Sequence, residues 1–260
     1  MATATIGQVM ARQPQNSQQH TPMQTGQPRS EFASGERREV CSECDGQKYL
    51  RFDVPRGHPA FGRLMPCPKC NADAVTYNSG LNLLERKITF ADIDAQGRAG
   101  AGKMLSAAKA FMGHKSGFLT FHGGYGNGKS TTMKALVNAC LAEGVEARYI
   151  TMTEVMVYAR EAFESTKAGD TDYGRIEKLA RIRVLVIDEC EKARVTDYAR
   201  EVQTHLFDVR YRNADVLGTV VAWNGKFEAL DLPWVRSRLS EYVVVENLDA
   251  DMRPLIGGLA

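Results

Sequence analysis

The octet GGYGNGKS, residues 123–130, places glycines, a lysine and a serine at the spacing of a phosphate-binding loop. Its glycines allow successive backbone N–H groups to turn inward around phosphate oxygens, and a helix that begins at the end of the loop would direct its positive N-terminal end at them. Lys129 is expected to bridge the β- and γ-phosphates of ATP, and Ser130 to bind magnesium. A bare glycine-rich turn is the alternative. The residues expected to contact the nucleotide are Gly123, Gly124, Tyr125, Gly126, Asn127, Gly128, Lys129, Ser130 and Thr131.

Two carboxylates end an apolar stretch further along the chain, in VLVIDE, residues 184–189. A buried strand of this type would deliver Asp188 and Glu189 to the carboxyl edge of a parallel sheet, beside the phosphate-binding loop. Asp188 is expected to hold the magnesium shell together with Ser130. Glu189 is expected to polarise the attacking water, so Lys129 and Glu189 are candidate catalytic residues. The alternative is that both acids are exposed strand-end residues.

Four of the six cysteines form two CxxC pairs, CSEC at 41–44 and CPKC at 67–70. Each pair lets two sulfurs converge on one ion, and four thiolates match the tetrahedral coordination of zinc. A redox function fits less well, because a thioredoxin-like site has one CxxC motif at the start of a helix. So small a module is expected to depend on the metal for folding. The predicted zinc ligands are Cys41, Cys44, Cys67 and Cys70.

These groups need a scaffold, and short apolar runs that alternate with helical patterns predict one. The runs are continuous rather than alternating with polar residues, which is typical of parallel strands buried on both faces. We therefore expect an α/β fold with a five-stranded parallel sheet covered by helices on both faces. The predicted strands are 118–121, 147–150, 184–187, 219–222 and 242–245.

Composition limits the class of protein further. The apolar content is 43% and the formal net charge is +2, which is ordinary for a globular protein and too mild for binding nucleic acid through bulk charge. There is no apolar run of about 18 residues, and the N-terminus has no basic segment followed by an apolar one. We expect no membrane span, no secretory signal and a cytoplasmic location.

Four regions are expected along the chain. Residues 1–38 are rich in Gln, Ser, Thr and Pro, which predicts a disordered tail. Residues 39–74 contain the CxxC pairs and form a small zinc-ribbon-like module. Residues 75–100 are expected to be a linker, and residues 101–260 the nucleotide-binding domain.

The order of GGYGNGKS, VLVIDE, a strand ending in VVAWN and the segment WVRSRLS resembles the AAA+ ATPases, and within them the bacterial helicase loaders of the DnaC and DnaI type. The resemblance covers roughly residues 85–254. It implies a P-loop AAA+ domain, magnesium-dependent ATP hydrolysis and an ATP-dependent homo-oligomer. It also implies that Asn224 senses the γ-phosphate. Arg238, with Arg236 as the nearby alternative, would reach the nucleotide of a neighbouring subunit and stabilise charge on its γ-phosphoryl group.

Two further segments bear on this resemblance. Residues 153–181 are long for one crossover and predict two helices about a Gly and Asp turn, resembling an insertion that steers single-stranded DNA in initiators and loaders. Lys178, Arg181 and Arg183 could contact phosphates there, and a plain crossover helix with a loop is the alternative. The segment after the last strand is expected to be too short for the helical lid of most AAA+ proteins, although Arg253 lies where compact loaders place a late arginine.

Three functions remain open. The first is a loader that binds a replicative hexameric helicase and delivers it to single-stranded DNA during DNA replication. The second is a transposition-helper ATPase that assembles on duplex DNA, and the third an ATP-regulated adaptor whose zinc ribbon reads nucleic acid. Exposed apolar residues in 47–65 would favour a protein partner, whereas an aligned basic face would favour nucleic acid. The motif order and the missing lid favour the loader.

Overall fold

The computed structural model of the chain describes residues 41–45, 47–51, 56, 61–62, 64–67, 69, 78–163, 171–192, 196–230 and 232–252. The predicted tail at 1–38 lies outside these residues. Within them, none of the helices combines the length and apolar character needed to cross a bilayer.

The largest folded part of the chain is built on five parallel strands. The strands are β3 (Gly117–Gly123), β4 (Ala147–Thr151), β5 (Val184–Asp188), β6 (Gly218–Asn224) and β7 (Val243–Asn247). Their order across the sheet is β4-β5-β6-β3-β7. The five predicted strands are confirmed, with ends that differ by one or two residues. Because all five run in one direction, the residues that follow β3, β5 and β6 meet at one edge of the sheet.

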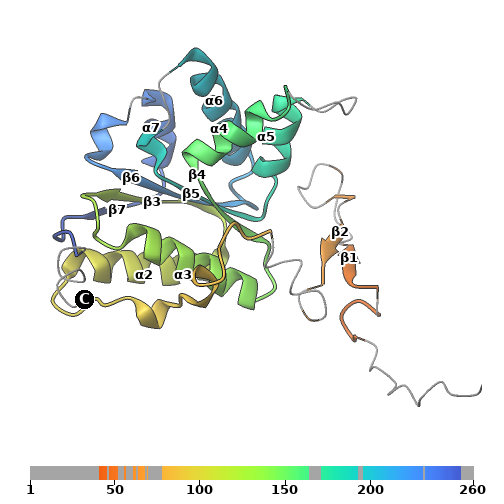
Figure 1. Cartoon of the computed structure of the whole chain (residues 1–260), viewed down its shortest axis with the longest axis horizontal. Coiled ribbons are helices and arrows are strands. Elements are labelled where there is room, and N and C mark those ends of the chain that lie inside the picture. Colours follow the sequence, from red (N-terminus) through yellow and green to blue (C-terminus); the bar gives the residue numbers. More distant parts are fainter. Residues whose placement is uncertain are drawn as a thin grey trace, which may run out of the picture. The chain divides into compact units, whose positions relative to one another are not determined.

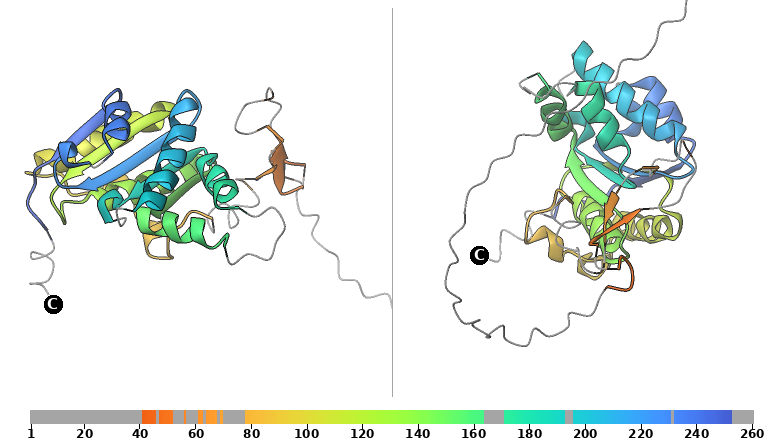
Figure 2. Two further views of the ribbon diagram at one scale, coloured as in Figure 1. Left: turned by 90° about the horizontal axis from the view of Figure 1, so that it is seen from above. Right: turned by 90° about the vertical axis from the view of Figure 1, so that its right-hand side faces the viewer.

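Helices cover both faces of this sheet, as predicted. Helices α2 and α3 lie on one face, and α4, α5, α6 and α7 lie on the other (Figure 1); the right panel of Figure 2 shows the sheet between these two layers. The helices are α2 (Ala99–His114), α3 (Lys129–Ala142), α4 (Met152–Arg160), α5 (Asp172–Ala180), α6 (Asp197–Arg212) and α7 (Pro233–Leu239).

Side chains that alternate along the strands form two separate cores. In β5, Val184 and Val186 pack with α2 and α3, whereas Leu185 and Ile187 pack with the helices of the other layer. This follows from the two-residue period of a strand, whose successive side chains point to opposite faces. By the same period, Asp188 at the end of β5 follows Val186 onto the face covered by α3.

One cation, Arg210 of α6, is fully buried at the amino edge of the sheet. Its guanidinium group donates hydrogen bonds to Thr219 Oγ1 at 2.9 Å and to Ala180 O at 2.9 Å, as well as to the carbonyl oxygens of Ile182 and Gly218. These acceptors lie where α5 ends and where β5 and β6 begin. The planar, five-donor guanidinium group suits such a divergent set of acceptors. Arg210 therefore ties two strands and two helices together.

Residues 78–98 pack against the sheet and α3. Tyr149 N on the edge strand β4 donates to Ser79 O at 2.7 Å, and Asn138 of α3 donates to Glu85 O at 2.8 Å. The Lys134 ammonium group lies 2.6 Å from a Glu85 carboxylate oxygen. The predicted boundary at residue 100 stays a prediction, but the segment before it has specific contacts with the domain.

The insertion between β4 and β5 forms two helices, α4 and α5, as expected. Both begin at threonine caps. Thr151 and Glu154 make a reciprocal capping box at the start of α4, and Thr171 Oγ1 accepts from Gly174 N at 3.0 Å at the start of α5. The turn between the two helices includes residues outside the described part of the chain.

A separate two-stranded hairpin carries the cysteines. Strand β1 (Tyr49–Arg51) pairs with β2 (Leu64–Pro66) in antiparallel fashion, with Tyr49 opposite Pro66 and Arg51 opposite Leu64. Tyr49, Arg51 and Leu64 are exposed, and Phe61 next to β2 is exposed as well. Within the described residues, the outer surface of the hairpin therefore mixes large apolar side chains with the exposed cations Lys48, Arg51, Arg56 and Lys69.

Candidate nucleotide-binding site and metal centre

The predicted phosphate-binding loop connects β3 to α3 at the carboxyl edge of the sheet. Gly123, Gly126 and Gly128 all have positive φ angles, of 129°, 65° and 94°. At Gly126 the space is also closed, because a Cβ atom would lie 1.6 Å from Asp251 Oδ1. The loop thus has the tight glycine turns that a phosphate-binding loop needs, and α3 begins at Lys129, so the N-terminal N–H groups of the helix lie at the end of the loop.

Lys129 is buried inside the loop. Its ammonium group donates to Gly124 O at 2.5 Å, to Asn127 Oδ1 at 3.1 Å and to Gly123 O at 3.2 Å. These acceptors are neutral oxygens of the loop itself. A triphosphate entering the loop offers charged oxygens instead, which are stronger acceptors for an ammonium group.

Asp188 is buried at the end of β5, on the face expected from the strand period. Its Oδ2 atom accepts from the Tyr149 hydroxyl at 2.6 Å, and its Oδ1 atom accepts from Glu189 N at 2.8 Å. Burial, and then the Asp188 carboxylate, raise the pKa of Tyr149, while the Ser130 side chain acts in the opposite direction on the same hydroxyl. Ser130, Tyr149 and Asp188 are therefore neighbours, although Tyr149 was not among the predicted site residues.

Glu189 follows Asp188 in a left-handed conformation, with φ of 53°. This conformation is uncommon for a residue with a side chain and marks a strained, position-specific turn. The Glu189 carboxylate is 32% exposed and lies 2.5 Å from the Lys192 ammonium group. The chain then continues as a short 3-10 helix, η3 (Cys190–Lys192). The predicted water-polarising acid is thus at the site edge and paired with a lysine.

Asn224 ends β6 directly beside the start of the loop, in register with Gly123. Gly123 and Gly225 exchange backbone hydrogen bonds of 3.1 and 3.0 Å, which fix this edge of the sheet. The amide groups of Asn224 contact Glu191 of η3, with the backbone N–H donating to Glu191 Oε2 at 3.1 Å and the side-chain Nδ2 donating to Oε1. Glu191 was not predicted. The only sequence signal was a third acid in the run DECE.

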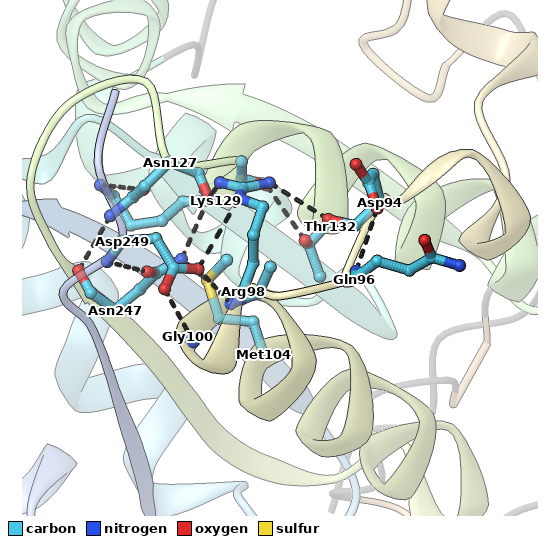
Figure 3. Close-up of polar contacts among 12 residues, drawn as sticks. Asp94, Gln96, Arg98, Gly100, Met104, Asn127, Lys129, Thr132, Asn247 and Asp249 are labelled. Carbon is cyan, nitrogen blue, oxygen red and sulfur yellow. Dashed lines mark hydrogen bonds and ion pairs between the residues drawn. The ribbon is translucent and has the colours of Figure 1, made fainter. Parts of the chain in front are cut away.

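The loop is also tied to residues that are distant in sequence (Figure 3). Asn127 Nδ2 donates to Asn247 O at 2.9 Å, and Asn247 Nδ2 donates to Asn127 O at 3.0 Å. Arg98 also donates to Asn127 O, at 3.2 Å, and Asp249 accepts from Gly100 N and caps the start of α2. The end of β7 therefore contacts the phosphate-binding loop, and the segment after it contacts the start of α2. None of these contacts was predicted.

Arg238, the predicted trans-acting arginine, lies on α7 and is engaged within its own chain. Its guanidinium group forms an ion pair with Asp208 and lies over the rings of Tyr211 and Trp234, at 4.8 and 5.2 Å from their centroids. Arg236 donates to the carbonyl oxygen of Glu228. Both arginines are partly exposed, so a second chain can reach them.

The other predicted basic residues have mixed surroundings. Arg181 pairs with Glu177 at 2.9 Å, four residues earlier, and Arg183 donates to Lys115 O at the amino edge of the sheet. Lys178 is on α5, and Arg253 lies outside the described residues. The predicted contact with phosphates therefore stays open for α5.

Three of the four predicted zinc ligands come together. The sulfur atoms of Cys41, Cys44 and Cys67 all lie within 4.8 Å of one another, and those of Cys41 and Cys67 are 3.7 Å apart. Two sulfurs on one tetrahedral zinc ion at about 2.3 Å are separated by roughly 3.8 Å, whereas a disulfide bond is about 2 Å long. Hydrogen bonds, first from the backbone N–H of Glu43 and then from the backbone of Cys44 and the neighbouring thiols, lower the pKa of Cys41 to about 7. The geometry fits a metal centre, and Cys70 lies outside the described residues.

No protein-family model matches this chain, and no curated protein matches it in sequence. Solved structures do match in fold. A crystal structure of DnaI is 15% identical, with a TM-score of 0.53 over 66% of this chain and 94% of that one. A crystal structure of the DnaC helicase loader is 16% identical, with a TM-score of 0.50 over 64% of this chain and 99% of that one.

A structure of the replication initiator DnaA bound to AMPPCP and single-stranded DNA is also similar, at 17% identity and a TM-score of 0.56. The alignment covers 66% of this chain and 53% of that chain. At these identities the similarity establishes the fold. The chain has the fold of these structures, with the five-stranded parallel sheet covered by helices on both faces that the sequence predicted, and its site chemistry has to be argued from its own residues.

Proposed function

We propose that this chain is an ATP-dependent helicase loader. The observation that carries the proposal is the convergence of Lys129, Asp188 and Asn224 at the carboxyl edge of one sheet. A phosphate-binding lysine, a metal-binding carboxylate and an amide beside the γ-phosphate position are the groups that nucleotide hydrolysis needs, and parallel strands bring them to a single edge.

The proposed mechanism uses these residues in separate steps. Lys129 exchanges its loop oxygens for phosphate oxygens, and the N–H groups of the loop and of α3 bind the remaining phosphate charge. The Glu189 carboxylate leaves its ion pair with Lys192 and orients the attacking water. Asn224 donates a hydrogen bond to the γ-phosphate. Ser130 and Asp188 would hold magnesium, which neutralises phosphate charge when it is bound.

A neighbouring subunit would complete the site. Arg238 lies near the end of α7, where it contacts Asp208, Tyr211 and Trp234. We propose that its guanidinium group acts on the nucleotide of another chain. Such an arrangement makes hydrolysis dependent on assembly, because the cation that stabilises the transition state comes from outside. The ATP-dependent homo-oligomer is part of this proposal.

Two observations favour a loader over the other candidates. This chain aligns with 94% of the chain in the DnaI structure and 99% of that in the DnaC helicase loader structure, but with 53% of that in the DnaA structure. The cysteine hairpin exposes Tyr49, Phe61 and Leu64 beside exposed Lys48, Arg51 and Arg56, and we propose that its apolar side chains bind a protein partner. We propose that zinc, held by Cys41, Cys44, Cys67 and Cys70, maintains this surface for a replicative hexameric helicase.

The test combines the protein with a replicative hexameric helicase and circular single-stranded DNA, with and without ATP. Wild-type protein is expected to place helicase on the circle in an ATP-dependent manner. Lys129→Ala should abolish nucleotide binding and loading, and Glu189→Gln should retain bound ATP without turnover. Lys109→Ala, on the exposed side of α2, is the matched control and should behave as wild type. Normal turnover in both site variants, or no helicase on the DNA with wild-type protein, would refute the proposal.

The hairpin can be tested separately from the nucleotide site. Removing zinc with a chelator is expected to abolish capture of the helicase and to leave ATP affinity unchanged within about twofold, because the metal organises only the cysteine module. Tyr49→Ser with Leu64→Ser should do the same without metal loss. If the protein assembles on duplex DNA and captures no helicase, the transposition-helper reading replaces the loader.

A further inference from the structure

The three acids at the end of β5 and just after it each have a different polar partner. Asp188 binds the Tyr149 hydroxyl, Glu189 lies against Lys192, and Glu191 takes both amide donors of Asn224. The side-chain amide of Asn224, which the sequence predicts to sense the γ-phosphate, therefore already donates a hydrogen bond to the Glu191 carboxylate.

The backbone explains how Glu191 reaches the next strand. The left-handed turn at Glu189 reverses the chain, and Lys192 N closes it by donating to Glu189 O at 3.0 Å. This places η3 (Cys190–Lys192) against the end of β6 and against α4. Glu191 and Asn224 are both only partly buried, so the pair faces the open edge of the sheet, where a nucleotide would enter.

The pairing has a chemical consequence for nucleotide recognition. A carboxylate that accepts two hydrogen bonds holds the Asn224 amide in one orientation. The same carboxylate is an anion, and a γ-phosphate brought beside it would experience like-charge repulsion. ADP, which has no γ-phosphate, meets neither obstacle.

We infer that Glu191 is a positioning residue that holds Asn224 in the nucleotide-free protein and yields it to the γ-phosphate of ATP. This inference rests on the proposed function and adds a residue to it. Glu191 lowers ATP affinity relative to ADP, since part of the ATP binding energy is used to separate Glu191 from Asn224. Because η3 contacts α4, the release of Glu191 also links γ-phosphate binding to the inserted helices.

The test measures the dissociation constants of a slowly hydrolysed ATP analogue and of ADP, both with magnesium. Glu191→Ala should tighten binding of the analogue on the order of tenfold, the size expected for one hydrogen bond to a charged group, and leave ADP within about twofold. Glu191→Gln keeps the side-chain shape and one acceptor oxygen, so its effect should have the same sign and be smaller. Glu228→Gln, an exposed acid at the same edge, is the control and should change neither constant.

A double-mutant cycle separates positioning from general charge effects. In Asn224→Ala protein, which lacks the side-chain donor, adding Glu191→Ala should no longer tighten binding of the analogue. The inference is overturned if Glu191→Ala leaves the ratio of the two constants unchanged, weakens the analogue, or acts equally in the Asn224→Ala background. Wild-type protein that binds no magnesium-ATP would overturn the proposed function first and this inference with it. Normal wild-type binding with unresponsive Glu191 variants would overturn the inference alone.

Discussion

Lys129 and Arg210 are both buried cations that donate to oxygens of their own chain, yet they lie at opposite edges of the sheet and differ in what surrounds them. The acceptors of Arg210 are carbonyl and hydroxyl groups at the fixed ends of helices and strands. Those of Lys129 belong to a glycine-rich loop, and Gly124 is exposed. The comparison shows that burial alone does not identify a structural cation. A buried cation is structural when water or a ligand cannot replace it as the hydrogen-bond donor to its acceptors.

The largest loss of stability is expected from Arg210→Met. The change leaves the carbonyls of Ala180, Ile182 and Gly218 without their buried donor, and we expect the free energy of unfolding to fall by about 3 to 5 kcal/mol. Urea unfolding followed by circular dichroism measures it. Arg212→Met, two residues along and exposed, is the control and should change stability by less than about 0.5 kcal/mol. Equal effects of the two changes would remove the structural role assigned to Arg210.

Tyr149→Phe is expected to cost less, about 1 to 2 kcal/mol, because it removes one hydrogen bond from the buried Asp188 carboxylate. The same change should alter the magnesium concentration needed for half-maximal ATP binding, since Asp188 loses the group that orients it. Urea unfolding and a magnesium titration test the two effects. Tyr158→Phe, on α4, serves as the control. Unchanged magnesium dependence would show that the Tyr149 hydroxyl does not orient Asp188.

Arg238→Ala should reduce stability by about 1 kcal/mol or less, since its ion pair with Asp208 and its ring contacts are partly exposed. Nucleotide affinity should stay at the wild-type level, while turnover at high protein concentration falls to that of the dilute protein. ATP hydrolysis measured against protein concentration tests this. Arg236→Ala is the comparison variant, and loss of concentration dependence there, with Arg238→Ala unaffected, would assign the trans-acting role to Arg236.

A small stability change is also expected for Lys129→Met, within about 1 kcal/mol of wild type, because water can satisfy the loop oxygens that the ammonium group leaves. ATP affinity, by contrast, should fall more than about 100-fold, as phosphate binding depends on this charge. Thermal unfolding and isothermal titration calorimetry together give both values. A loss of stability as large as that of Arg210→Met would erase the distinction between the two cations.

The sequence predicted those parts of the fold that depend on local pattern. Continuous apolar runs predicted all five strands, and the glycine spacing predicted the loop whose three positive φ angles are observed. Helix α2 was not predicted, because AGAGKMLSAAKAFMGH is rich in small residues and has a weak apolar face. Its burial depends on packing against α3 and β7, which no local pattern records.

The missed site residues are those that act across long sequence separations. Asn247, which was not predicted, exchanges hydrogen bonds with the predicted Asn127 across 120 positions, and the missed Tyr149 reaches Asp188 from the neighbouring strand. Arg210 had a signal, since it lies four residues after Leu206 on the apolar face of α6, where a cation is unexpected. Glu191 had a weaker one, as a third acid after the strand. Cys70 lies outside the described residues, so the fourth predicted zinc ligand stays a prediction.

The anchoring of the last described residues has a practical consequence for labelling. Met252 N donates to Gly126 O at 3.1 Å, so the polypeptide leaves the described region in contact with the phosphate-binding loop. A dye attached to a cysteine at position 252 would sit within reach of an incoming triphosphate and could report its arrival optically, whereas a bulky purification tag fused just beyond that point would crowd the same entrance.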